Sequence, residues 1–379
     1  MNPQFSLFDL LILLGIIQGI ITSILLLNSK KNIQSNKLLA LALLSFCFLS
    51  TKPLLHTFHL WETNFFRFFP NGIELALSPL IYFYIKSLVT SRFRFKPRHW
   101  IHFIPFLLAQ IYAFIVYFSV LRVNDFNEKD SIAQSFSFDF VKQSEEYLLL
   151  LLLPFYLFYS YKELMNYKKW LDNTISDSTF PDFSWLKNIF KLSLLIGLFL
   201  LVNHFLDIFF DLGDTTVLHY NLLNLFIAFM IYYLGLKGYL QPDYTFSKNE
   251  IATTTNLPSK ISDVKFKETV EQLQKVMDVD KVFLYPKLTI RELSYMINIP
   301  QRDLSHIINQ YYKLSFRDFI NQYRLEDVKS KLKDENYSHM SILGIALESG
   351  FNSEASFYRI FKKNTGVSPK EFIQQKNNE

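Results

Sequence analysis

A long apolar run near the N-terminus, FDLLILLGIIQGIITSILLL, constrains the fold of this chain more than any other feature. An α-helix needs about 20 mainly apolar residues to cross the hydrocarbon core of a bilayer, and this run has that length. It does not read as a cleaved signal peptide, because no basic residue precedes it, it is too long, and no small-residue cleavage motif follows. We therefore predict an integral membrane protein.

Six further apolar runs follow within the first 240 residues. On the same length criterion the seven predicted spans lie near residues 8–27, 38–58, 73–90, 99–121, 147–161, 188–206 and 220–240. The fifth run, YLLLLLLPFYLFYSY, is short by itself, so we expect its helix to extend past Glu146 or Lys162.

The distribution of Lys and Arg over the connecting loops predicts the orientation of these spans. The first, third and fifth loops together carry 11 basic residues, and the three alternate loops of similar total length carry 4. Basic residues accumulate in short cytoplasmic loops. We therefore predict a multi-pass protein of the cell (inner) membrane, with the N-terminus outside and everything after residue 240 in the cytoplasm.

Composition excludes several classes of function. Half of the residues are hydrophobic, yet the mean hydropathy is only +0.13, which indicates a membrane part joined to a polar part. The single cysteine, Cys47, excludes an intrachain disulfide and cysteine-based zinc chemistry. Phosphate-binding, dinucleotide-binding and zinc-protease motifs are absent. We predict no catalytic residues, no cofactor and no metal site, so the chain is not expected to be an enzyme.

The composition of the sequence changes after residue 240. Residues 241–264 are polar, with two prolines and a Thr triplet, and we predict a flexible linker there. From residue 265 to residue 379 the apolar spacing becomes helical. TIRE and SPKE predict capping boxes at helix N-termini, and SFRD predicts a weaker version of the same cap.

Two segments of this C-terminal domain match each other. RELSYMINIPQRDLSHIINQ and LGIALESGFNSEASFYRIFKK each predict a short helix, a tight turn and a second amphipathic helix. Asn298 and Gly350 occupy the equivalent turn position, and both residue types tolerate a left-handed backbone. Two such units make a pair of helix-turn-helix motifs. The helical run of about 18 residues between them, some 27 Å long, suits two recognition helices entering successive major grooves of double-stranded DNA.

The second unit carries a family resemblance. SILGIALESGFNSEASFYRIFKKNTGVSPKEF resembles the signature of the AraC/XylS family of bacterial transcription regulators, and the resemblance covers roughly residues 265–375. The combination with a many-span N-terminal half is similar to membrane-anchored AraC-type regulators of Bacteroidetes-like bacteria. One departure is Phe372-Ile373, where the family often has Tyr-Arg, and a phosphate contact or local salt bridge is in doubt there.

The resemblance implies base-reading residues at the exposed start of each recognition helix: Arg302, Ser305 and His306 in the first unit, and Glu354, Ala355, Tyr358 and Arg359 in the second. Arginine reads guanine, glutamate accepts from cytosine and alanine touches the thymine methyl group. Lys362 and Lys363 are expected to contact phosphates. The alternatives are charge stabilisation of the helix N-terminus by Glu354, a solvated surface charge at Arg359, and packing of Tyr358 on lysine side chains.

Three polar residues near the predicted outer ends of spans form a hypothetical signal pocket: Glu74, His204 and Asp207. Polar groups within spans are costly and mark functional sites by default. Hydrogen bonding between helices is the alternative for each of them.

Together these observations predict an all-α chain, a seven-helix transmembrane bundle followed by two helix-turn-helix units joined by a long helix. The expected function is membrane-bound, sequence-specific transcriptional regulation by a one-component sensor. Its partners would be promoter DNA, the lipid bilayer, an unidentified small-molecule or external signal, and a second copy of the chain in a homodimer. The alternative functions are a transporter or channel with a regulatory or vestigial cytoplasmic domain, and a regulator that the spans only anchor.

Overall fold

The computed structural model describes residues 5–30, 33–90, 93–177, 183, 185–210, 218–241 and 263–377. In these ranges every regular element is a helix, and one isolated β-bridge joins Ile175 to Thr289. The prediction of an all-α chain is thus confirmed for the described residues. The chain forms two compact units, one of Met1–Leu164 with Phe183–Lys248 and one of Met165–Asp182 with Asn249–Glu379. Most of the predicted linker, residues 241–264, lies outside the described residues.

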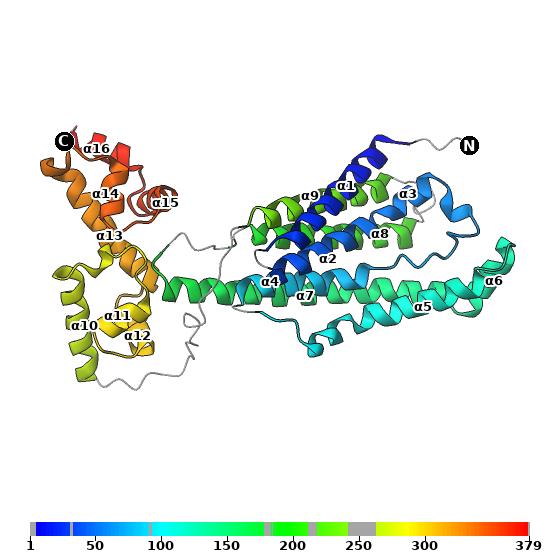
Figure 1. The fold of residues 1–379 in the computed structure, drawn as a ribbon, viewed down its shortest axis with the longest axis horizontal. Helices are drawn as coiled ribbons and strands as arrows, with labels where there is room; N and C mark the ends of the chain where they lie inside the picture. The colour runs from blue at the N-terminus through cyan, green and yellow to red at the C-terminus, as the bar shows by residue number, and fades with distance from the viewer. Residues whose placement is uncertain are drawn as a thin grey trace. The chain divides into compact units, whose positions relative to one another are not determined.

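The first unit is built from long apolar helices with short helices between them (Figure 1). In chain order they are α1 (Leu7–Asn28), α2 (Ile33–Leu49), α3 (Thr51–Thr57), η1 (Leu60–Glu62), α4 (Glu74–Val89), η2 (Pro97–Phe103), α5 (Ile104–Val120), α6 (Phe126–Ser135), α7 (Phe138–Thr174), α8 (Leu186–Phe210) and α9 (Leu218–Tyr239). Each of the seven apolar runs predicted from the sequence is largely helical, but the second is divided between α2 and α3 and the fourth between η2 and α5.

Four helical stretches in the described part of the chain are long and apolar enough to cross a membrane: Leu7–Asn28, Ile33–Thr57, Pro97–Val120 and Phe138–Thr174. The apolar part of α9, Leu223–Tyr239, is shorter, and α4 has 16 residues. The fifth run extends at both ends, as expected, into the 37-residue helix α7. Crossing by all seven helices remains a prediction.

Small residues bring α1, α2 and α9 close together. A Cβ atom added at Gly15 of α1 would lie 2.9 Å from the Cβ of Ala228 on α9, and one added at Gly19 would collide with Cys47 on α2. Without a hydrophobic drive between helices in lipid, close packing of small residues is a main source of helix association. The buried thiol of Cys47 therefore has a packing role, as expected for a lone apolar cysteine.

The C-terminal part of the second unit contains seven α-helices in its described residues: α10 (Asp263–Asp278), α11 (Ile290–Met296), α12 (Gln301–Tyr311), α13 (Phe316–Lys333), α14 (Ile342–Glu348), α15 (Glu354–Thr365) and α16 (Pro369–Asn377). Short helices η4 (Val282–Leu284) and η5 (Glu335–Tyr337) lie between them. One core cluster gathers α10 to α12 against the first half of α13, and a second gathers α14 and α15 against its second half.

Candidate nucleic-acid interface

The first helix-turn-helix unit consists of α11 and α12. Thr289 caps α11 in a reciprocal capping box with Glu292, as the TIRE motif predicted. The turn is made by Asn298, whose φ of 52° is in the left-handed region. Leu304, Ile307 and Ile308 of α12 are fully buried and face the core. This local pattern fixes which face of α12 points outward.

The outward face of α12 carries the residues predicted to read bases. The side chain of Arg302 is exposed, with its Nε atom 3.3 Å from an oxygen of the neighbouring Asp303. Ser305 and His306 are half-buried, and the Ser305 hydroxyl accepts from the amide of Asn309 at 3.3 Å. Arg302 is therefore the most accessible of the three candidates.

The second unit, α14 and α15, repeats the arrangement. Ser341 caps α14 and Ser353 caps α15, each accepting from a backbone N–H three residues on. Gly350 makes the turn with a φ of 93°. Phe357, Ile360 and Phe361 of α15 are buried, as the apolar residues of α12 are in the first helix-turn-helix unit.

The outer face of α15 presents a mixed set of polar and charged groups. Glu354, Ala355, Arg359 and the two lysines, Lys362 and Lys363, are exposed. Tyr358 is half-buried and packs on the core, with its ring centroid 5.2 Å from that of Phe357. This packing on an aromatic core differs from the packing on lysines that we considered for Tyr358, and it leaves Arg359 as the most prominent long side chain at the start of the helix.

A joint between the two units holds them in one orientation. Arg324, in the middle of the 18-residue helix α13, is only 2% exposed. Its Nε atom donates to the carbonyl of Phe283 at 2.8 Å, and its Nη2 atom donates to the carbonyl of Tyr285 at 2.8 Å. Both acceptors lie in or just after η4, which packs in the same core cluster as α11 and α12, and the turn glycine of the second helix-turn-helix unit, Gly350, packs against the same place. Asn352 adds a bond of 3.1 Å to the carbonyl of Pro286.

Burial of Arg324 has an electrostatic consequence. Desolvation lowers its pKa to about 10, and the carboxylate of Asp177 opposes this shift. The guanidinium stays charged at neutral pH because its donors are satisfied by carbonyl oxygens. Arg324 therefore acts as a charged cross-link that sets the relation between α12 and α15.

Sequence reasoning missed this cross-link, although a signal was present. Phe316, Ile320 and Val328 recur at helical spacing and are buried, and Arg324 occupies the same stripe. Asn321 is also buried, and Arg317 has a side chain only 13% exposed. A line of polar residues on an apolar helix face predicts specific buried partners.

The second compact unit of the fold includes a segment from the middle of the chain that the sequence did not predict to lie there. Residues 171–177, here called the strap, comprise the end of α7 and the three residues after it. Ile175 of the strap forms the β-bridge with Thr289, the cap of α11. Ser176 donates its backbone N–H and its hydroxyl to the carbonyl of Leu288, at 3.2 and 2.6 Å.

The signal pocket suggested for Glu74, His204 and Asp207 remains a prediction. Glu74 forms an ion pair with Lys52. The side chains of His204 and Asp207 lie outside the described residues. The first compact unit does contain an open cavity of about 770 Å³ between α1 and α9, lined mainly by apolar side chains together with Gln18 and Tyr232, and several of its lining side chains, such as Leu14 and Phe229, are exposed. Within the described part of the chain no cluster of three or more His, Cys, Asp or Glu side chains is suited to hold a metal ion.

Comparisons with known proteins agree with the geometry of the C-terminal part. Residues 293–375 match the family model of a helix-turn-helix domain. Over 102 residues the chain is 31% identical to an uncharacterized HTH-type transcriptional regulator of Staphylococcus aureus (strain MSSA476). The matched region covers 27% of this chain and 13% of that protein. Over 85 residues it is 31% identical to the melibiose operon regulatory protein of Escherichia coli (strain K12), covering 22% of this chain and 27% of that protein. No solved structure matches the chain.

Proposed function

We propose that this chain, whose C-terminal part is a helix-turn-helix domain of the AraC type, is a membrane-bound, sequence-specific transcriptional regulator. The observation that carries the proposal is the pair of recognition helices, α12 and α15, which present polar outer faces while Arg324 and Gly350 fix the joint between their units. Two recognition helices held in a fixed relative orientation suit two sequence elements of one DNA duplex that lie about a helical turn apart.

The charge of this part of the chain favours recognition by local contacts. From Lys237 to the C-terminus, 21 Lys and Arg face 18 Asp and Glu, so the overall attraction to DNA is modest. Arg302 and Arg359 are placed to read guanine, and Glu354 and Ala355 to read cytosine and thymine. Lys362 and Lys363 are placed for phosphate contacts that add affinity without sequence information.

The contact between the strap and α11 supports the proposed topology. Since the strap follows α7 and contacts α11, both lie on one side of the membrane. An even number of crossings must therefore separate them, which agrees with crossing by both α8 and α9. The strap also lies in the basic loop that we predicted to be cytoplasmic. We place the regulator in the inner membrane, with its N-terminus outside and its DNA-binding part in the cytoplasm.

Sensing completes the proposal. An external or lipid-soluble signal would bind the membrane part and favour one of two arrangements of its helices. The apolar cavity between α1 and α9 is one place for a lipid-soluble signal. Pairing of two chains on adjacent DNA elements would raise the effective concentration of the second reading domain.

The test is selection of bound duplexes from a random pool by the full-length protein in detergent, compared with the Arg359→Ala and Lys362→Ala variants. We expect an enriched motif of two elements about one helical turn apart. Arg359→Ala should relax selection at one element, whereas Lys362→Ala should weaken binding evenly and reduce the salt slope by about 1. A pool that stays unenriched at low salt with the wild-type protein would refute sequence-specific binding.

A further inference from the structure

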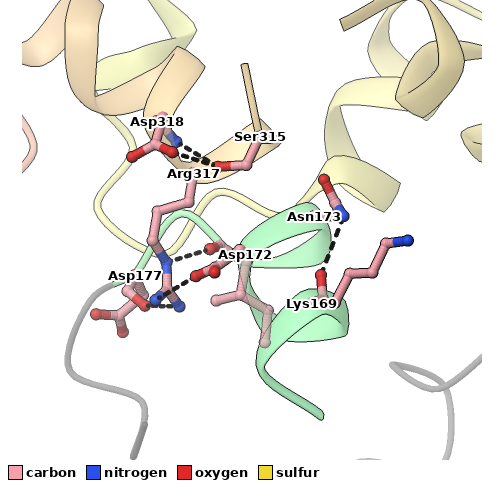
Figure 2. A network of polar contacts seen from close by, with 8 residues as sticks. Lys169, Asp172, Asn173, Asp177, Ser315, Arg317 and Asp318 are labelled. Atoms are coloured by element: carbon pink, nitrogen blue, oxygen red, sulfur yellow. Dashed lines mark hydrogen bonds and ion pairs between the residues drawn. The ribbon is translucent and has the colours of Figure 1, made fainter. Parts of the chain in front are cut away.

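The strap is held to the DNA-binding domain by an arginine of α13. Three nitrogens of Arg317 bond to it: Nη1 to the Asp172 carboxylate at 3.2 Å, Nε to the Ile175 carbonyl at 3.1 Å, and Nη2 to the Asp177 carbonyl at 3.1 Å (Figure 2). The Ile175 side chain is 1% exposed. The contact is therefore built from a buried apolar anchor and a guanidinium whose three nitrogens are all engaged.

This contact lies within electrostatic range of the second recognition helix. Burial lowers the pKa of Arg317, and among the nearby charges Asp172 raises it while Arg359 of α15 lowers it. Lys363 of α15 acts electrostatically on the Asp172 carboxylate. The strap thus brings the Asp172 carboxylate within electrostatic range of Lys363, a candidate phosphate contact, while Arg317 lies within range of Arg359, a candidate base reader.

The strap also continues the helix that contains the fifth predicted span. Helix α7 is continuous from Phe138 to Thr174, and within the first unit its residue Glu163 pairs with Lys86 of α4 at 3.4 Å. A helix transmits a shift or rotation of one end to the other because its backbone hydrogen bonds keep it stiff. A rearrangement of the membrane helices around α7 therefore acts directly on the strap.

We propose that the strap is an autoinhibitory element, which competes with DNA phosphates for Arg317 and is released when α7 moves. The inference rests on the proposed function and names its regulation. In the docked state Arg317 bonds to the strap, and Asp172 lies within electrostatic reach of α15. In the released state Arg317 gains a phosphate contact, and the carboxylates leave the face that DNA approaches.

The test measures binding of the full-length protein in detergent to a mixed-sequence 30-base-pair duplex at 50 to 200 mM salt, by fluorescence anisotropy. Ile175→Asp is designed to release the strap, and it leaves the sequence of the DNA-binding part, residues 263–377, unchanged. Asn173→Asp is the matched control, because it adds the same charge to the same segment, and the Asn173 amide donates to the nearby carbonyl of Lys169 on α7 (Figure 2).

We expect Ile175→Asp to bind more tightly at low salt, with a salt slope steeper by about 0.9, the value for one added phosphate contact. Its affinity then falls about 3.5-fold more than that of the wild type over this fourfold salt range. Asn173→Asp should bind no more tightly than the wild type. Adding Arg317→Met to Ile175→Asp should remove the gain.

Two further measurements keep the outcome decisive. Hydrogen exchange of α11 and α15 reports whether Ile175→Asp leaves the domain folded, and Asp172→Ala is a milder variant that removes only the carboxylate from Arg317. If neither variant raises affinity or steepens the salt slope, the strap is a structural part of the domain and the proposal is refuted. Loss of sequence selection in the wild type would instead refute the proposed function, because the salt slope on a mixed duplex does not depend on selectivity.

Discussion

Replacement of Gly350 by alanine tests the joint between the two helix-turn-helix units. The glycine has a φ of 93°, and a Cβ atom there would lie 2.6 Å from the carbonyl oxygen of Phe283 and 3.0 Å from Nε of Arg324. Gly366 is the matched control, since its φ of 81° is similar but an added Cβ would meet no atom within 4 Å. The two variants thus differ mainly in whether the added Cβ atom collides with neighbouring atoms.

The expected magnitude follows from that difference. The left-handed conformation costs an L-residue about 1–2 kcal/mol, and this cost applies at both positions. The reduced freedom of the unfolded chain also applies at both and cancels in the comparison. Forcing a methyl group into a packed joint adds about 1–3 kcal/mol. Gly350→Ala should therefore lower the free energy of opening of α14 and α15 by about 1–3 kcal/mol more than Gly366→Ala.

Hydrogen exchange of the full-length protein measures this quantity, because amide protection reports local opening free energies. DNA binding gives a second readout. Gly350→Ala displaces the second unit from Phe283, so it should weaken binding to a two-element duplex more than to either element alone, while Gly366→Ala should affect both alike. Equal losses of protection in the two variants would show that the close approach of Gly350 does not hold the units together.

Three other predictions concern single features. Arg324→Met should destabilise the domain by about 1–3 kcal/mol, because the buried carbonyl of Phe283 loses its charged donor; thermal unfolding monitored at the domain's tyrosines checks this. The backbone N–H of Ser368, and after it the Ser368 hydroxyl, lower the pKa of Glu371. The contact therefore stabilises the domain above the ordinary carboxyl pKa and is lost as pH falls through the lowered value. Ser368→Ala removes the hydroxyl and keeps the backbone N–H, so the Glu371 pKa, followed by NMR, should rise only part of the way toward its usual range. Cysteines placed at Lys169 and Glu128 in a Cys47→Ala background should label from opposite sides of the membrane, and labelling from the same side would contradict the topology.

Much of the domain followed from local rules that a single sequence carries. The capping boxes at Thr289 and Ser368, the left-handed turns at Asn298 and Gly350 and the length of α13 are all confirmed. Each depends on residues within four positions of one another, where spacing alone determines the hydrogen bonds. The buried faces of α12 and α15 followed in the same way from helical periodicity.

The contacts between distant parts of the chain did not follow from such rules. The Ser176 hydroxyl lies 3.2 Å from Nη2 of Arg324, although 148 positions separate them, and nothing in either local pattern names the other. The polar residues on the apolar face of α13 were a signal that buried partners exist. Their identity required the fold, because backbone carbonyls such as those of Phe283 and Tyr285 can come from any residue type.

Arg324 and Arg317 of α13 bond to different parts of the chain. This difference suits a structural role for Arg324 and the proposed regulatory role for Arg317. Arg324 bonds to carbonyls of residues 283–286, so most of its partners remain when the strap leaves. Arg317 bonds to Asp172, Ile175 and Asp177, all of the strap. A guanidinium that loses such partners needs new acceptors, and phosphate oxygens match its planar donors. In the proposed regulation, the residue that holds the strap therefore gains a phosphate contact when the strap is released.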